Sequence, residues 1–465
     1  MSRLTIRLAT LASALSLAGC VNLAPELQRP ALPVPAQLPV SEATSSASLP
    51  GWQALLRDER LRQVVELALA GNRDLRVTLL NVDKSRAQLR LTDADRWPTV
   101  SAALIGSRAP NSSGTEVTSV QAGLQLSSYE IDLLGRVRNA SDAAAATLLA
   151  TEAGARSARL ALVAQTVSAW LTLAADGEQL QLAQQTLSSR DETLRLTALR
   201  ERVGAASGLE LRAAQSLVAS ARASVAQLQR QLAQDRNALN LVVGQTVAEP
   251  LLPGSSTLSG SEWLAGVPAG LSSELLLQRP DVIQAEQQLA AANANVGAAR
   301  AAVFPRITLS GSAGQVSSTL AGLFDGGASF AYTLTASAAV ALFDAGRNEA
   351  NVQIARLGRE QAVASYEKAV QTAFRETADA LQAQTSWRDQ VQAQQDLLQA
   401  ERERTRLTRL KLDSGAASLV DLLDAERSLA SAQQALVQVR LAELLNRLAL
   451  YKALGGGAEA AAAKG

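Results

Sequence analysis

Residues 279–312 read RPDVIQAEQQLAAANANVGAARAAVFPRITLSGS, and the pattern of this sequence changes from helical to extended within the stretch. Its first part is rich in strong helix formers, and Asp281 lies where a carboxylate favours the positive end of a helix dipole. Pro305 ends the helix because proline has no backbone N–H to donate. Apolar residues then alternate with hydroxyl residues from Ile307 to Ser312, which is the period of a strand. A long helix therefore passes directly into an amphipathic strand.

The same transition from helix to strand occurs earlier in the chain. Asp74 and Pro98 precede Asp281 and Pro305 by 207 positions each. Three glycine pairs are separated by 211 positions: Gly135 and Gly346, Gly204 and Gly415, and Gly244 and Gly455. The chain is therefore a tandem duplication whose second copy has gained four residues between Pro305 and Gly346. Repeats of this size predict a duplicated domain rather than a solenoid.

Composition argues against several classes of protein. The 465 residues include 44 basic and 43 acidic side chains, so no nucleic-acid partner is expected. The chain has no histidine, the commonest general base and metal ligand, and its one cysteine is Cys20. We therefore expect no enzyme activity, no catalytic residue, no metal site and no cofactor. Aromatic residues make up 3% of the chain, which favours long, closely packed helices over a compact globular core.

The N-terminal residues are typical of an exported protein. Residues 1–19 have a basic start, an apolar centre and small residues before a cleavage point, which predicts a signal peptide. The sequence Leu17-Ala18-Gly19-Cys20 also resembles a bacterial lipobox, so Cys20 is expected to carry lipid. The alternative is a plain signal peptide with an incidental cysteine. Residues 20–51 are rich in proline and alanine, and they predict a lipid-anchored extended linker.

The two copies predict the same order of elements. A short helix from Trp52 to Ala70 comes first, and each strand hairpin leads into a very long helix without proline. The expected first repeat spans 52–244, with a strand hairpin at 98–130 and a long helical hairpin at 136–243. A connector is expected at 245–272. The expected second repeat spans 273–455, with a strand hairpin at 305–342 and a long helical hairpin at 347–454, and a disordered tail follows at 456–465.

The strand pattern alone leaves two interpretations open. Apolar and polar residues alternate clearly from Ser119 to Ser127 and from Phe330 to Ala338. Such alternation is found in a soluble antiparallel sheet with one face on a core. It is equally the signature of a strand in a membrane barrel, although the signal from each strand is weak.

Four motifs give the chain a resemblance to a known family. They are ELLLQRPD at 274–281, GAARAAVFP at 297–305, YEIDLLGR at 129–136 and LFDAGR at 342–347. Together they resemble the TolC/OprM-type outer-membrane efflux factors, specifically the NodT-like lipoprotein subfamily, over essentially the whole mature chain. The resemblance implies a mainly α protomer with a β-barrel part. It also implies a trimer, in which each chain gives four strands to a shared twelve-stranded barrel while the long helices form a periplasmic α-barrel.

The resemblance also implies a function and its partners. The protein would be the passive exit duct of a tripartite efflux system, embedded in outer-membrane lipid. It would work as a homotrimer with a periplasmic adaptor (membrane fusion) protein and an inner-membrane RND-type transporter. An alternative from another class is a lipid-anchored periplasmic coiled-coil adaptor or scaffold. The paired amphipathic strands argue against that alternative, because an adaptor needs no membrane barrel.

Three residues after the second helical turn are candidates for a periplasmic gate. Val420, Asp421 and Asp424 match family positions that line a constriction, so three copies would make rings of carboxylates that select cations. The other interpretation is local: Ser418 and Asp421 fit a capping box, with Asp424 on a solvated helix face. The first copy has Glu210 and Ala213 at the equivalent positions.

The resemblance also points to a lock on the gate and to surfaces for an adaptor. Related channels have an arginine near this turn, where this chain has Ala417. Arg409 or Arg202 is the expected replacement. The adaptor is expected to contact both helical turns, and the residues concerned are Gly204, Ser207, Gly415 and Ser418.

Overall fold

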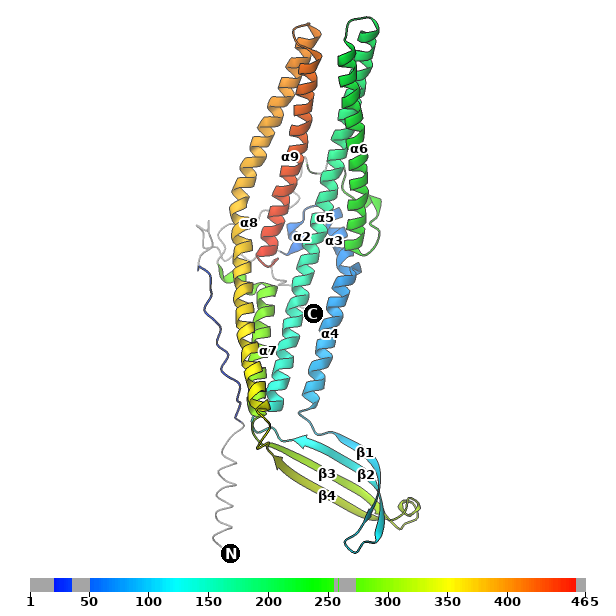
Figure 1. The fold of residues 1–465 in the computed structure, drawn as a ribbon, viewed down its shortest axis with the longest axis vertical. Coiled ribbons are helices and arrows are strands. Elements are labelled where there is room, and N and C mark those ends of the chain that lie inside the picture. Colours follow the sequence, from blue (N-terminus) through cyan, green and yellow to red (C-terminus); the bar gives the residue numbers. More distant parts are fainter. Residues whose placement is uncertain (1–20, 36–50, 255–257, 259–272, 457–465) are drawn as a thin grey trace. The chain divides into compact units, whose positions relative to one another are not determined.

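The computed structural model describes residues 21–35, 51–254, 258 and 273–456, which form two compact units. Among the described residues, the strand unit comprises 21–31, 81–152 and 284–368, and the hairpin unit comprises 32–35, 51–80, 153–254, 258, 273–283 and 369–456. Figure 1 shows the elements. They are α2 (Trp52–Leu55), α3 (Glu59–Gly71), α4 (Arg73–Ala94), β1 (Val100–Pro110), β2 (Glu116–Glu130), α5 (Arg136–Arg202), α6 (Gly208–Val243), η1 (Glu249–Leu251), η3 (Ser273–Gln278), α7 (Pro280–Ala301), β3 (Arg306–Ser317), η4 (Ala321–Leu323), β4 (Ser329–Ala339), α8 (Arg347–Asp413) and α9 (Leu419–Ala453).

The element lengths are nearly the same in the two halves of the chain. Helices α4 and α7 both have 22 residues, and α5 and α8 both have 67. Helices α6 and α9 have 36 and 35 residues. The starts of α4 and α7 are 207 positions apart and those of α5 and α8 are 211 apart, as the repeat of the sequence predicts.

The prediction of one helix from Trp52 to Ala70 is wrong. The helix α2 ends at Leu55, and Leu56 is extended, with a ψ of 118°. Helix α3 then begins anew because the Asp58 carboxylate accepts a hydrogen bond from the backbone N–H of Leu61 at 3.0 Å. Such a cap contributes about 1 kcal/mol to helix stability, enough to favour a new start over a continuous helix.

The core of the hairpin unit is built around α5. Trp170 and Leu171 are fully buried, and they belong to a cluster with Val163 and with Tyr451 of α9. The Trp170 indole also donates to the carbonyl of Leu251 at 3.0 Å. One window of α5 is long and apolar enough to cross a membrane, but half of it is buried inside the protein, as expected for a core helix.

The strand unit contains one antiparallel sheet in the order β1-β2-β3-β4 (Figure 1). The β2–β3 pairing joins the two repeats, and β1 and β4 are the edge strands of the described sheet. The register brings apolar residues together in one row across all four strands, Val100, Leu126, Gly311 and Leu334. The next row is polar, with Ser101, Gln125, Ser312 and Thr333. The sheet therefore has one apolar and one polar face.

Two facing glycines hold β2 and β3 unusually close together on the polar face. Gly123 and Gly314 are paired in the register. A Cβ atom at Gly314 would lie 2.2 Å from the Ala122 carbonyl oxygen, and one at Gly123 would lie 2.3 Å from that of Ala313. Glycines at such positions allow a sheet to bend sharply, as closure into a barrel requires.

The first described residues pack against the same unit. The backbone N–H of Val21 donates to the Leu133 carbonyl at 3.2 Å, just beyond the end of β2. Asn139 donates to Asn22 at 2.9 Å, and Asn293 of α7 donates to the Pro25 carbonyl at 2.8 Å. The segment that follows position 20 is therefore fastened at the helical end of the sheet.

Candidate gate and docking turns

The two helical turns have the same backbone conformation. Gly204 and Gly415 follow α5 and α8 with φ of +73° and +78°, the left-handed region that glycine adopts without strain. In the first turn Ala205 N–H donates to the Arg200 carbonyl at 2.7 Å. In the second turn Ala416 N–H donates to the Lys411 carbonyl at the same distance. Both turns lie at the same end of the hairpin unit (Figure 1).

A capping box begins the helix after each turn. The Asp421 carboxylate accepts from the Ser418 N–H at 2.9 Å and from the Ser418 hydroxyl at 2.7 Å. The Ser418 hydroxyl in turn accepts from Asp421 N–H at 3.2 Å. Ser207 and Glu210 form the same box at the start of α6. These contacts hold the pKa of Asp421 below its usual value, so this carboxylate stays charged and fixed at the helix start.

Asp424 is held by two arginines of its own chain. Arg404 donates to the Asp424 carboxylate at 2.6 Å, and Arg427 forms a second ion pair with it. The contacts with Asp424 raise the pKa of Arg404. Arg409, which the sequence suggested as a lock residue, instead pairs with Glu426 at 2.5 Å. The sequence analysis did not predict that Arg404 pairs with Asp424. The two residues are equally distant from Ser414 in the sequence, and residues equally far from the turn of a helical hairpin face each other.

The three gate candidates lie together at the start of α9. The Val420 side chain is 62% exposed, and the carboxylate of Asp424 is 41% exposed although it is ion-paired. Local capping explains the position of Asp421, and the two arginines explain that of Asp424. At this end of the hairpin, exposed acidic and basic side chains are therefore held in fixed positions beside the exposed Val420 side chain.

One of the expected docking turns lines a groove. Gly415, Leu419 and Leu422 face the end of α5 across a cavity of about 990 Å³, whose α5 wall includes Thr193 and Arg200. Ser418 caps α9 and lies next to this groove without lining it. Gly204 and Ser207 belong to the other turn. Cys20 lies outside the described residues, so its lipidation stays a prediction.

A pair of carboxyl groups in the first hairpin was not foreseen from the sequence. Burial, together with a hydrogen bond to Asp235, raises the pKa of Asp176 to about 7. The pair joins α5 to α6, and Gln231 donates to Asp235 at 2.9 Å. The position equivalent to Asp235 in the second repeat is Asn446. The first hairpin therefore carries a proton-dependent contact where the second has an amide.

We expect Asp235→Asn to stabilise the protein at pH 8. Folding favours the protonated form of Asp176, so its contribution to stability is present at low pH and is lost as pH rises from about 4 to about 7. The asparagine removes the repulsion and should gain on the order of 2 kcal/mol at pH 8, and little at pH 4.5. Thermal unfolding at both pH values measures this difference. Equal shifts at the two pH values would show that the carboxyl pair is not the cause.

Comparison with known proteins agrees with this architecture. The family model described as "Outer membrane efflux protein" matches the chain twice, at residues 64–245 and 271–456, once in each repeat. The chain is 40% identical over 459 residues to the probable efflux pump outer membrane protein TtgC of Pseudomonas putida, covering 96% of this chain and 94% of TtgC. It is 38% identical over 451 residues to the cation efflux system protein CusC of Escherichia coli, covering 96% of this chain and 98% of CusC.

Solved structures give the same result. A crystal structure of CusC has a TM-score of 0.85 at 38% identity, with 94% of this chain and 100% of that chain covered. The open state of the Neisseria gonorrhoeae MtrE outer membrane channel has a TM-score of 0.84 at 36% identity, with 94% and 98% covered. These matches decide between the two interpretations of the strands, and they favour a channel over an adaptor. The chain belongs to the outer membrane efflux protein family.

Proposed function

We propose that this outer-membrane efflux channel works as a homotrimeric exit duct, whose barrel contains four strands from each chain. The observation that carries the proposal is the described sheet, which has an apolar face, a polar face and two edge strands. Open strand edges are not tolerated in lipid, because their N–H and C=O groups would lack partners. Pairing β1 of one chain with β4 of the next satisfies both edges and closes the sheet.

The oligomeric state tests this proposal directly. Native mass spectrometry of the protein released from detergent micelles should give the mass of three chains. A chain that stays monomeric in several mild detergents would contradict the proposal. In the proposed trimer, the polar row that includes Ser101 and Thr333 would line the duct, and the row that includes Val100 and Leu334 would face lipid.

The periplasmic partners are proposed to meet the hairpin turns. An adaptor protein would contact the turns at Gly204–Ser207 and Gly415–Ser418, and would link the channel to an RND-type transporter of the inner membrane. The shared conformation of the turns and the groove beside Gly415 support this placement. Photo-crosslinking to the cognate adaptor from positions 205 and 416 tests it. Crosslinks that appear only at positions far from both turns would rule it out.

Lipidation of Cys20 is part of the same proposal. The contact between Val21 and Leu133 supports it, because residue 21 lies where the membrane sheet ends and the helices begin. An acyl chain on the preceding residue would reach the inner leaflet of the outer membrane without a long tether. Intact-mass measurement should find Cys20 as an acylated N-terminus. A free N-terminus at another residue would contradict this assignment.

We also propose that Val420, Asp421 and Asp424 narrow the periplasmic end of the duct. In a trimer, three copies of the Asp424–Arg404 pair would stand around one axis. Asp424→Ala should raise conductance in planar bilayers and weaken block by divalent cations. The substitution removes the carboxylate with which Arg427 pairs and leaves Arg404 paired with Glu401, so the ring of negative charge and the link from α8 to α9 are both lost.

A matched control separates this effect from a change of net charge. Glu403→Ala removes another exposed carboxylate, which pairs with Arg406 on α8. This variant should conduct like the wild type. The gate assignment would be wrong if Asp424→Ala left conductance and divalent block unchanged, or if Glu403→Ala changed them equally.

A further inference from the structure

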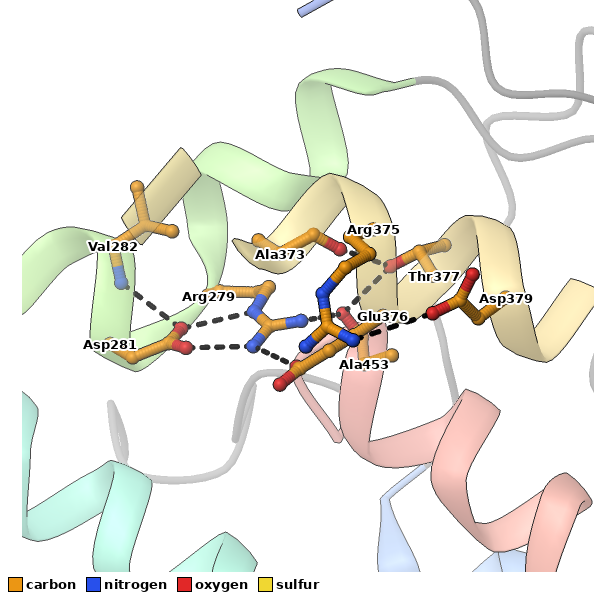
Figure 2. A network of polar contacts seen from close by, with 9 residues as sticks. All are labelled: Arg279, Asp281, Val282, Ala373, Arg375, Glu376, Thr377, Asp379 and Ala453. Carbon is orange, nitrogen blue, oxygen red and sulfur yellow. Dashed lines mark hydrogen bonds and ion pairs between the residues drawn. The ribbon is translucent and has the colours of Figure 1, made fainter. Parts of the chain in front are cut away.

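Arg279 is a buried cation at the point where three helices meet. Its side chain is 5% exposed, and Figure 2 shows it between α7, α8 and the end of α9. Nη2 donates to Asp281 at 2.7 Å and to Glu376 of α8 at 2.8 Å. Nη1 donates to the carbonyl of Ala453, the last residue of α9, at 2.7 Å. One guanidinium therefore fastens the foot of the α8–α9 hairpin to the start of α7.

Thr377 strengthens the same contact. Its hydroxyl lies within hydrogen-bond distance of the carbonyls of both Ala373 and Ala453, at 2.9 and 3.2 Å (Figure 2). The equivalent residue in the first repeat, Thr166, is within hydrogen-bond distance of Leu162, one turn earlier in its own helix. The last carbonyl of α9 thus accepts from Arg279 and shares the Thr377 hydroxyl with Ala373, so a carbonyl that has no partner within its own helix is satisfied by side chains.

The first repeat builds the same junction without charge. Asn72 occupies the position equivalent to Arg279, and its amide donates to the Val242 carbonyl of α6 at 2.7 Å. Val242 is equivalent to Ala453, and Gln165 is equivalent to Glu376. The contact to the carbonyl is therefore conserved between the repeats at the same distance. Only the second repeat adds an ionic link to the neighbouring long helix.

The clamped hairpin is the one that carries the gate candidates. Asp421 and Asp424 lie at the start of α9, and Ala453 ends the same helix. At 1.5 Å per residue, 35 residues span about 50 Å. A tilt of about 5° at the foot of such a helix moves its other end by about 4 Å. A small change in helix direction at Arg279 therefore becomes a large displacement of Asp421 and Asp424.

We propose that Arg279 is a positioning residue for the periplasmic gate. Its clamp consists of ion pairs with Asp281 and Glu376 and a hydrogen bond to the Ala453 carbonyl. This clamp fixes the foot of the α8–α9 hairpin, and so fixes where Asp421 and Asp424 stand. The first hairpin is held at its own foot by the neutral Asn72 contact, which uses none of the residues of this clamp. The inference deepens the proposed function and rests on the trimeric duct.

The two repeats supply the variant that tests this inference. Arg279→Asn combined with Glu376→Gln gives the second junction the residues of the first. Asp281, whose side chain is 36% exposed, then stands without Arg279, as its equivalent Asp74 does in the first repeat. Spin labels on cysteines at the equivalent positions 205 and 416 then report the two turns separately. Distances between labels on neighbouring protomers should shift or broaden by about 4 Å at Ala416→Cys and stay unchanged at Ala205→Cys. Single-channel recordings should show an open fraction raised several-fold.

Controls keep a structural effect apart from a positioning effect. Arg375→Asn with Asp379→Asn removes an exposed ion pair of α8, shown beside the clamp in Figure 2, and should change neither distances nor conductance. Thr377→Val removes one donor to Ala453 with little change of shape, so it should give a smaller shift of the same kind at 416. Wild-type protein treated with the same spin label reports any signal from Cys20.

The possible outcomes separate the positioning role of Arg279 from the proposed trimeric duct. If the labelled Ala205→Cys and Ala416→Cys proteins with an intact clamp give no defined distances between protomers, and the wild type does not conduct, the trimeric duct itself is wrong. If distances and conductance are both found, but the double variant and Thr377→Val leave the distances at 416 unchanged, Arg279 does not position the gate. Equal changes at 205 and 416 would also overturn the inference, because they would indicate general loosening.

Discussion

Replacing Gly314 by valine is expected to abolish assembly of the outer-membrane sheet. A Cβ atom at this position would lie 2.2 Å from the Ala122 carbonyl oxygen of the neighbouring strand, which is backbone and cannot rotate away. The strands would have to separate where the two repeats join, at the pairing of Gly123 with Gly314. We expect a loss of about tenfold or more in assembled trimer, measured by heat-modifiable migration in gels and by size-exclusion chromatography.

Gly106 provides the matched control in the same sheet. A Cβ atom there meets no atom of the described residues within 4 Å. Gly106→Val should therefore assemble like the wild type, and valine even favours a strand. Normal assembly of Gly314→Val, or equal loss in both variants, would show that the close approach of β2 and β3 is not needed for the barrel.

The single substitution Arg279→Met should cost about 3 kcal/mol of stability. Burial opposes charge on Asp281, but its contacts with Arg279 prevail and lower its pKa, so the carboxylate depends on this partner. Removing one member of a buried ion pair costs about 3–5 kcal/mol. We expect the lower end, because Asp281 and Glu376 are each 36% exposed and keep some water.

Thermal unfolding in detergent measures this cost. The midpoint should fall by about 3 °C, since a chain of 465 residues gains about 1 kcal/mol/K of entropy on unfolding. Arg375→Met removes an exposed cation from the neighbouring turn of α8 and should cost less than about 1 kcal/mol. Similar midpoints for the two variants would mean that the clamp is not a buried network in solution. The double variant Arg279→Asn with Glu376→Gln leaves one carboxylate, Asp281, without its partner instead of two, so its midpoint should lie between those of Arg279→Met and the wild type.

Much of the fold follows from local sequence. Proline-free runs fix the long helices, so α5 begins at Arg136 and ends at Arg202 where the pattern predicts. Left-handed glycines mark both turns, and Ser418 with Asp421 shows its capping box in the sequence itself. The repeat then transfers each of these predictions to the other half of the chain.

Contacts between distant segments could not be predicted in the same way. The pairing of Gly123 with Gly314 depends on which strand of one repeat meets which strand of the other, and local alternation does not encode that choice. The same is true of Asp176 with Asp235 and of Arg404 with Asp424, which depend on how two helices are rotated against each other. The split at Asp58 was missed for a different reason, because apolar spacing continued through a residue that caps a helix.

In the proposed duct, three chains close one barrel and conduct through it. The direct test is the conductance of the purified protein in planar bilayers, recorded from the peak that contains the trimer. Discrete single-channel steps are expected, and they should become larger or more frequent in Asp424→Ala and disappear in Gly314→Val. A trimer that inserts into the bilayer and conducts in neither the wild-type nor the Asp424→Ala form would contradict this proposal.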